Sequence, residues 1–288
     1  MSGKVDIPID GGPIETLGLK SRLFFGNTLM MSMANDAAYL LALNLGMGLR
    51  RQNHGEHIHF FFCLDDAVVG RLTAKGFHAS RIPPEWIPPS IFADIDGKGH
   101  GFSWAEKGHI SVNQAKAFII RQILGAGISV MMIDADISFL RQGGVEKMLE
   151  PLRGGKDFVG TLEGRDDMFF KPHVNGGLFA MRATDRMREL VEIMAINHLR
   201  SPAVNDQILL NQILDNWGCK INFPNEGWVH YQHDHEFGNG DNYIRNDWIH
   251  TTNPYTLHAN YVVGLPKKIA GLKNNKGWHL TPAEERFV

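Results

Sequence analysis

Short apolar runs alternate with segments of helical periodicity along most of the chain, which predicts strands and helices in turn. The run at 128–133 is apolar at nearly every position, which is typical of a strand buried on both faces. Similar patterns predict strands at 28–34, 58–64, 77–80, 158–162, 178–181 and 256–263.

Helix-capping residues precede segments whose apolar side chains recur every three or four positions. Predicted helices follow Asn35, Asp65, Thr184 and Asn205, begin at a capping box in 111–114, and span about 145–152. The segment 83–108, rich in proline and glycine, is expected to be a long surface excursion, and residues 1–26 to be irregular. The alternation favours an α/β fold with a parallel, nucleotide-binding type of sheet.

Composition and charge exclude several function classes. The net charge of −2 gives no basic footprint for nucleic acid, and no apolar run approaches the roughly 18 residues that a membrane span needs. Of the two cysteines, Cys63 lies in an apolar run, which predicts a buried thiol and argues against a disulfide framework with Cys219. We therefore expect a cytoplasmic protein, the alternative being a trimmed luminal domain of a membrane-anchored enzyme.

Two carboxylates, Asp134 and Asp136, follow the buried run at 128–133. Open α/β sheets bind ligands at the carboxyl ends of their strands, and two anions this close repel each other unless a cation lies between them. Carboxylate oxygens suit Mg²⁺ or Mn²⁺, ions that usually also hold substrate phosphates. The pair indicates a metal–diphosphate site, while capping of a turn remains the alternative.

Three other segments carry candidate chemistry. The glycines 176–177 let a backbone approach a ligand closely, or form a plain turn. Gly264, followed by two lysines, has the composition of a phosphate cradle. Lys116 lies near a predicted helix start, where the macrodipole does not favour a cation. This hints at an anionic ligand, although a solvated lysine is the simpler interpretation.

Taken in order, these motifs resemble those of GT-A-fold glycosyltransferases, in particular the nucleotide-diphospho-sugar transferase family. The resemblance runs from about Thr28 to Lys268 and is carried by Lys116, Ile133-Asp134-Ala135-Asp136, Asn175-Gly176-Gly177, Asn205-Asp206-Gln207 and His258 through Gly264 to Lys267. An Asp-x-Asp motif alone is weakly specific, whereas the ordered set is fairly specific. The resemblance implies a mixed, mainly parallel, Rossmann-like central sheet flanked by helices. It also implies a single domain over residues 1–288, with 269–288 as a C-terminal tail.

The resemblance further implies roles for individual residues. Asp134, Asp136 and His258 match metal ligands, and the imidazole favours Mn²⁺ over Mg²⁺. Asn175, Asp206 and Gln207 match residues that recognise the sugar and flank the reaction centre. Residues expected to contact the nucleotide donor are Ala34, Asn35, Lys116, Asp134, Gly176, Gly177, Gly264 and Lys267.

The reaction implied is transfer of a sugar, with galactose or xylose as guesses, from a uridine diphosphate donor with retention of configuration. In the front-side route the departing phosphate helps to take the acceptor proton, while a metal and a lysine stabilise its charge. An inverting enzyme would need a carboxylate base, for which Asp206 is the candidate. The acceptor is left open among a glycan, a protein and a small molecule.

Two other functions fit some of the same residues. In a phosphohydrolase, Asp134 would be the nucleophile and Asp136 the acid/base, although the expected downstream lysine and acidic pair are not clear. A non-catalytic module would bind a nucleotide sugar or carbohydrate without turnover. The histidine-rich segment 228–248, with His230, His233 and His235, has a spacing able to bind zinc, but a polar loop on the acceptor side is the preferred interpretation.

Overall fold

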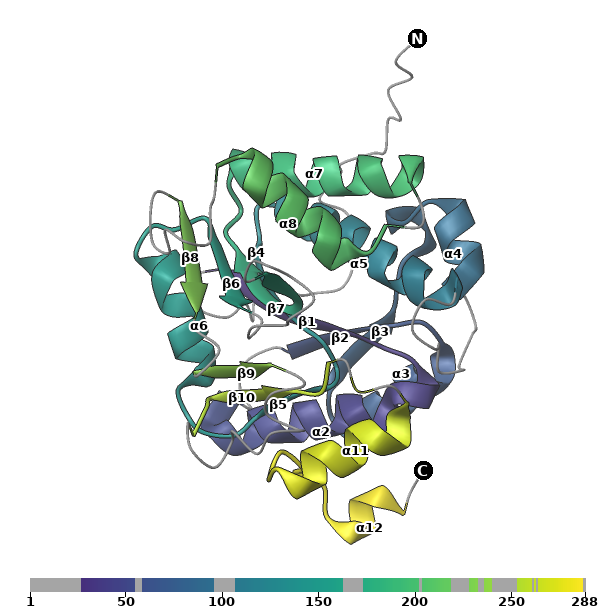
Figure 1. Ribbon diagram of the computed structural model, residues 1–288. Coiled ribbons are helices and arrows are strands. Elements are labelled where there is room, and N and C mark those ends of the chain that lie inside the picture. The colour runs from purple at the N-terminus through teal and green to yellow at the C-terminus, as the bar shows by residue number, and fades with distance from the viewer. Residues whose placement is uncertain are drawn as a thin grey trace.

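The structure, a computed structural model, contains a seven-stranded main sheet (Figure 1). In order across the sheet, the strands are β3 (His78–Arg81), β2 (His59–Cys63), β1 (Thr28–Ala34), β4 (Ser129–Ile133), β7 (Val174–Met181), β6 (Phe158–Leu162) and β8 (Val229–Gln232). The described residues are 27–54, 59–95, 107–162, 173–201, 204–218, 228–232, 236–239, 253–260, 262 and 264–286. Only β7 runs antiparallel to its neighbours, so the mixed, mainly parallel sheet is confirmed.

The centre of the sheet is formed by β1 and β4, whose residues are all buried. Both faces of these strands are covered, which explains why their sequences read as apolar runs without alternation. Met31 faces the same core as Phe118 of α5 (Lys107–Gly125), and Met30 packs with Leu45 of α2 (Tyr39–Leu49). Because successive strand side chains point to opposite faces, β1 joins the two halves of the core.

Helices cover both faces of the main sheet, as Figure 1 shows. On one face lie η4 (Pro84–Trp86), α4 (Pro89–Ile95), α5, α7 (Asp185–Arg200) and α8 (Asp206–Asn216). On the other lie η2 (Asp36–Ala38), α2, η3 (Arg50–His54), α3 (Asp66–Ala74) and α6 (Gly144–Arg153). α11 (Leu265–Asn274) packs against Leu41 of α2 through Leu272, and α12 (Pro282–Glu285) follows it. Asn35, Asp65, Thr184 and Asn205 cap the helices predicted to follow them.

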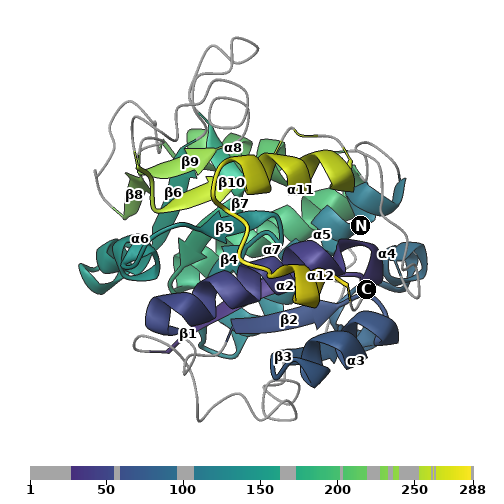
Figure 2. The same cartoon turned by 90° about the horizontal axis from the view of Figure 1, so that it is seen from below.

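A second, three-stranded sheet lies over α2 and has the order β5 (Ile137–Phe139), β10 (Thr256–His258), β9 (Phe237–Asn239) (Figure 2). β10 runs antiparallel to β5 and places His258 opposite Ile137. The backbone N–H of Ala259 also donates to the carbonyl oxygen of Asp136 at 3.1 Å. This pairing brings a distant part of the chain to the end of β4.

Several sequence-based expectations about local structure were wrong. The segment predicted as a surface excursion, 83–108, contains η4 and α4, and its Trp86 is buried in the core against Phe62. The predicted capping box at 111–114 lies inside α5, where the Ser111 hydroxyl donates to Oδ2 of Asp94 on α4. For residues 176–177, which are interior to β7, only the alternative of a plain turn was wrong.

The C-terminal part of the chain is more ordered than the word tail implies. The predicted strand at 256–263 is limited to β10, and α11 begins directly after Gly264. The buried Asn44 of α2 donates to the carbonyl oxygen of Gly277 at 2.9 Å and accepts from the N–H of His279 at 2.6 Å. The segment after α11 is thereby fastened across α2.

Composition led to expectations about the cysteines and about membrane-spanning segments. Cys63 is a buried free thiol, as predicted, and burial raises its pKa to about 12. Within the described ranges, every helix is too short or too polar to cross a bilayer. His233 and His235 of the zinc alternative lie outside the described residues, as does Cys219.

Candidate active site

A tight turn places the two carboxylates at the end of β4. The backbone N–H of Asp134 donates to the carbonyl oxygen of Gly177 at 2.7 Å, which extends the contact between β4 and β7. The N–H of Ile137 then donates to the carbonyl oxygen of Asp134 at 3.0 Å, and the chain enters β5. Asp136 is buried at this turn, whereas Asp134 is half-buried.

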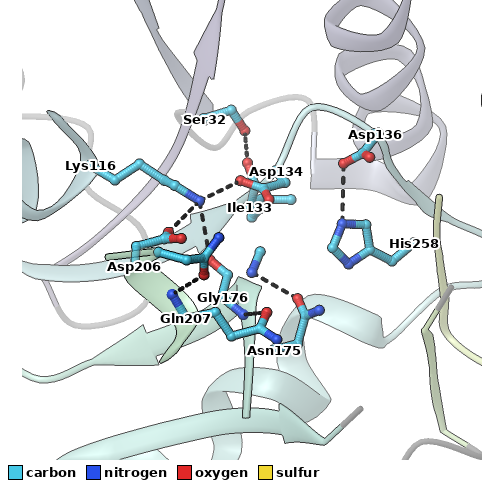
Figure 3. A network of polar contacts seen from close by, with 12 residues as sticks. Ser32, Lys116, Ile133, Asp134, Asp136, Asn175, Gly176, Asp206, Gln207 and His258 are labelled. Atoms are coloured by element: carbon cyan, nitrogen blue, oxygen red, sulfur yellow. Dashed lines mark hydrogen bonds and ion pairs between the residues drawn. The ribbon is translucent and has the colours of Figure 1, made fainter. Parts of the chain in front are cut away.

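His258 completes a three-residue cluster with the acidic pair. Its Nε2 atom lies 3.2 Å from Oδ1 of Asp136 (Figure 3). One ligand atom from each of Asp134, Asp136 and His258 lies within 4.8 Å of the other two. Two carboxylates and an imidazole form a donor set that suits a divalent transition metal. The three residues matched to metal ligands therefore lie together.

Gly177 makes room for this cluster. A Cβ atom at this position would lie 2.5 Å from Cε1 of His258 and 2.6 Å from Oδ2 of Asp134. Contacts this short would force the cluster apart, so residue 177 must lack a side chain. The donor set and the room beside Gly177 together fit a divalent cation.

Lys268 of α11 is a further contact of Asp136. It follows Gly264, which caps α11 with a left-handed φ of +94°, and its ammonium contacts Oδ2 of Asp136. Burial would raise the pKa of Asp136, but Lys268 and His258 hold it well below its usual range. The side chain of Lys267 is exposed, and Lys268 is the lysine that reaches the cluster.

Lys116 lies at the centre of a second polar network (Figure 3). Its ammonium contacts Oδ2 of Asp206 at 2.9 Å and Oδ1 of Asp134 at 3.2 Å, and donates to the carbonyl oxygen of Gly176 at 3.4 Å. Burial alone would lower the pKa of Lys116, but the two carboxylates raise it above its ordinary value. The interpretation of Lys116 as a solvated side chain was wrong, because its side chain is buried.

The remaining predicted catalytic residues brace the strand that carries the two glycines. Oε1 of Gln207 accepts from the N–H of Gly176 at 2.8 Å, and Oδ1 of Asn175 accepts from the N–H of Gly177 at 2.7 Å. Because Gln207 follows Asp206 at the start of α8, one helix end contacts both Lys116 and β7. The structure thus connects the residues assigned to sugar recognition.

A cavity of about 280 Å³ opens beside the acidic pair. Its charged lining residues are Asp134, Asp136 and Lys268, beside Gly264 at the start of α11. The rest of the lining is mainly apolar. It includes Ala34, Asn35 and Leu41 from the end of β1 to α2, and Val112 and Asn113 on α5. Ala34 and Asn35, predicted to lie near the nucleoside, therefore share a cavity with the acidic pair.

The comparisons with known proteins agree with this architecture. A model of the nucleotide-diphospho-sugar transferase family matches residues 57–272. The chain belongs to this family. Among solved structures, galactosyltransferase LgtC in complex with donor and acceptor sugar analogues has a TM-score of 0.51 and 16% sequence identity, over 90% of this chain and 99% of LgtC. This level of identity shows the shared GT-A fold alone.

Two further solved structures are similar at lower scores. Mouse xyloside xylosyltransferase 1 has a TM-score of 0.49 and 10% identity, over 83% of this chain and 99% of its own. The mannosyltransferase Ktr4p from S. cerevisiae has a TM-score of 0.48 and 8% identity, over 80% of each chain. The search of curated proteins found no match. Membership of the nucleotide-diphospho-sugar transferase family supports glycosyl transfer as the reaction class.

Sequence reasoning missed one internal support of this transferase site. Ser32 of β1 donates to the carbonyl oxygen of Ile133, directly before Asp134, and its hydroxyl lies 2.7 Å from Nε2 of His59 on β2. Because the Ser32 hydrogen is directed at Ile133, we assign the proton on His59 to Nε2. Burial lowers the pKa of His59 to about 3. The available signal was a polar residue inside each of two apolar strands.

Proposed function

We propose that the protein transfers a sugar from a nucleoside diphosphate donor to an acceptor hydroxyl, with a uridine diphosphate sugar as the preferred donor. The observation that carries the proposal is a cavity lined by both charged and apolar side chains. Asp134, Asp136 and Lys268 line it beside the candidate metal ligand His258, and apolar side chains such as Leu41 line it as well. A diphosphate with its cation suits the charged groups, and a nucleoside suits the apolar ones.

The cluster of Asp134, Asp136 and His258 fits a divalent cation, for which we favour Mn²⁺ because His258 supplies an imidazole. Asp134, Asp136 and His258 would hold it. When bound, the ion supplies Lewis-acid stabilisation of the negative charge that develops on a departing diphosphate. Lys268 supplies a second positive charge beside Asp136, where exclusion of water would strengthen its effect.

Retention of configuration is the proposed stereochemical course. An inverting transferase needs a carboxylate free to take the acceptor proton. The carboxylate of Asp206, the candidate base, is instead engaged at 2.9 Å by the buried ammonium of Lys116. We infer that Asp206 and Lys116 orient Asp134 and the β7 backbone, and that the departing phosphate takes the proton.

Incubation with a panel of nucleotide sugars, with and without Mn²⁺, tests this function. The protein should hydrolyse one donor slowly in a metal-dependent manner, because water substitutes for the missing acceptor. The anomeric configuration of the sugar transferred to an acceptor, read by nuclear magnetic resonance, tests retention separately. Metal-dependent binding of donors without hydrolysis or transfer would instead indicate a binding module.

A further inference from the structure

The lining of the cavity contains two uncharged polar side chains, Asn35 and Asn113, which have different surroundings. Oδ1 of Asn35 accepts from the N–H of Ala38 at 2.9 Å, so this side chain caps η2. The half-buried amide of Asn113 makes no hydrogen bond within the described part of the chain. Asn113 is thus the amide in this lining that the fold itself does not use.

The position of Asn113 is set by contacts on either side of it along α5. Two residues earlier, Ser111 donates to Oδ2 of Asp94 on α4 at 3.1 Å. Three residues later, the buried Lys116 is held by Asp134 and Asp206. Residues three apart on a helix lie on nearly the same side, so Asn113 lies one turn before Lys116. A side chain on a braced helix is pre-organised for a ligand.

The charged residues of the lining already supply the groups that suit a diphosphate and its cation. An uncharged amide instead suits the uncharged nucleoside, whose base and ribose carry both donors and acceptors. An asparagine amide offers two donor hydrogens and one acceptor oxygen. A ligand that cannot hydrogen-bond such an amide leaves it unpaired and binds more weakly, so the amide can discriminate between ligands.

We propose that Asn113 is a specificity-determining residue that hydrogen-bonds the nucleoside of the donor. This inference rests on the proposed function, because it takes the cavity to be the donor site. Asn113 would bind the nucleoside and not the diphosphate, so binding of these two parts of the donor can be measured separately.

Calorimetric titration in the presence of Mn²⁺ with inorganic pyrophosphate, uridine diphosphate and guanosine diphosphate tests the assignment. Asn113→Ala should weaken binding of the preferred nucleoside diphosphate about tenfold, the effect of one good hydrogen bond, and leave pyrophosphate binding unchanged. Asn113→Gln, which retains an amide, should lose less. Asn197→Ala on α7 is the matched control, since the amide of Asn197 bonds the carbonyl oxygen of Ile193 in its own helix.

Each outcome decides the matter. Equal affinity of the wild type and Asn113→Ala for both nucleoside diphosphates would overturn the role of Asn113 while leaving the proposed function intact. A parallel loss for pyrophosphate would also overturn it, because the effect would not belong to the nucleoside. If the wild type binds neither pyrophosphate nor either nucleotide with Mn²⁺, the proposed function fails and this inference fails with it.

Discussion

Nε2 of His258 lies 3.2 Å from Oδ1 of Asp136, although the two residues are far apart in the chain. Pairing of β10 with β5 creates this contact, because His258 lies opposite the residue that follows Asp136. The cluster therefore depends on a three-stranded sheet that is separate from the main sheet. Its geometry can be tested one residue at a time.

Asp136→Ala should abolish metal-dependent nucleotide binding while leaving the protein folded. We expect the affinity for a nucleoside diphosphate with Mn²⁺ to fall by at least about a hundredfold, since even residues behind the ligands of a metal site cost about 10–100-fold. Calorimetry and circular dichroism measure the two properties. Asp215→Ala on the exposed side of α8 is the control, and an unchanged affinity in Asp136→Ala would rule out the metal assignment.

Gly177→Ala should damage the same cluster without removing a ligand. The new methyl group would meet His258 and Asp134 at distances that require both to move. Displacement by about 1 Å is enough to cost roughly a hundredfold in turnover. Gly70→Ala in α3 is the control, because a Cβ atom there meets nothing within 4 Å. Wild-type turnover in Gly177→Ala would show that the cluster is looser than its geometry indicates.

Lys268→Ala and Lys267→Ala form a matched pair that tests which lysine binds the donor diphosphate. The structure favours Lys268, whereas the family resemblance implied Lys267. Lys268 contacts Asp136 and lines the cavity, whereas Lys267 is exposed. Loss of a charge-assisted contact of about 1.5–3 kcal/mol would weaken nucleoside diphosphate binding by roughly 10–150-fold in Lys268→Ala. Lys267→Ala should bind normally. The reverse result in a binding titration would restore Lys267 to the role implied by the family resemblance.

Most of the main sheet was predictable because its signals are local, but β8 was missed, since it lies in the segment 228–248 that was interpreted as a polar loop. The bounds of β1 and β6 agree with the predicted runs, and Asn205 caps α8 as its sequence indicates. By contrast, β5, β9 and β10 are only three residues long. Strands this short carry no useful periodicity, and their pairing joins distant segments. The candidate metal ligands could be named from the order of the motifs. The pairing of β10 with β5, which brings them together, could not be predicted.

Side-chain surroundings were harder to predict than the elements. Pro89 lies in the segment predicted to be a surface excursion, yet it begins α4, a position where a missing N–H costs nothing. Lys116 was expected near a helix start, but α5 begins at Lys107, and the packing of α8 and β7 buries the Lys116 ammonium. Which of the two adjacent lysines lines the cavity likewise depends on how α11 packs beside Asp136. These are properties of tertiary packing.

The buried His59 should make the fold sensitive to acid. Its folded-state pKa is about 3, below the ordinary value of about 6.5, so between these values the unfolded chain binds a proton that the folded chain does not. Stability is therefore present at neutral pH and is lost as the pH falls from about 6.5 toward 3. The loss is at most about 1.4 kcal/mol per pH unit from this residue.

His59→Gln isolates this contribution, because a glutamine amide can still donate to Ser32 but does not titrate. Urea unfolding at pH 7 and pH 5 should give a smaller decrease in the free energy of unfolding for His59→Gln than for the wild type. His78→Gln, at an exposed position on β3, should keep the wild-type decrease. If the three proteins lose stability in parallel, the proton linkage lies elsewhere, and the His59–Ser32 contact serves only to hold the end of β4.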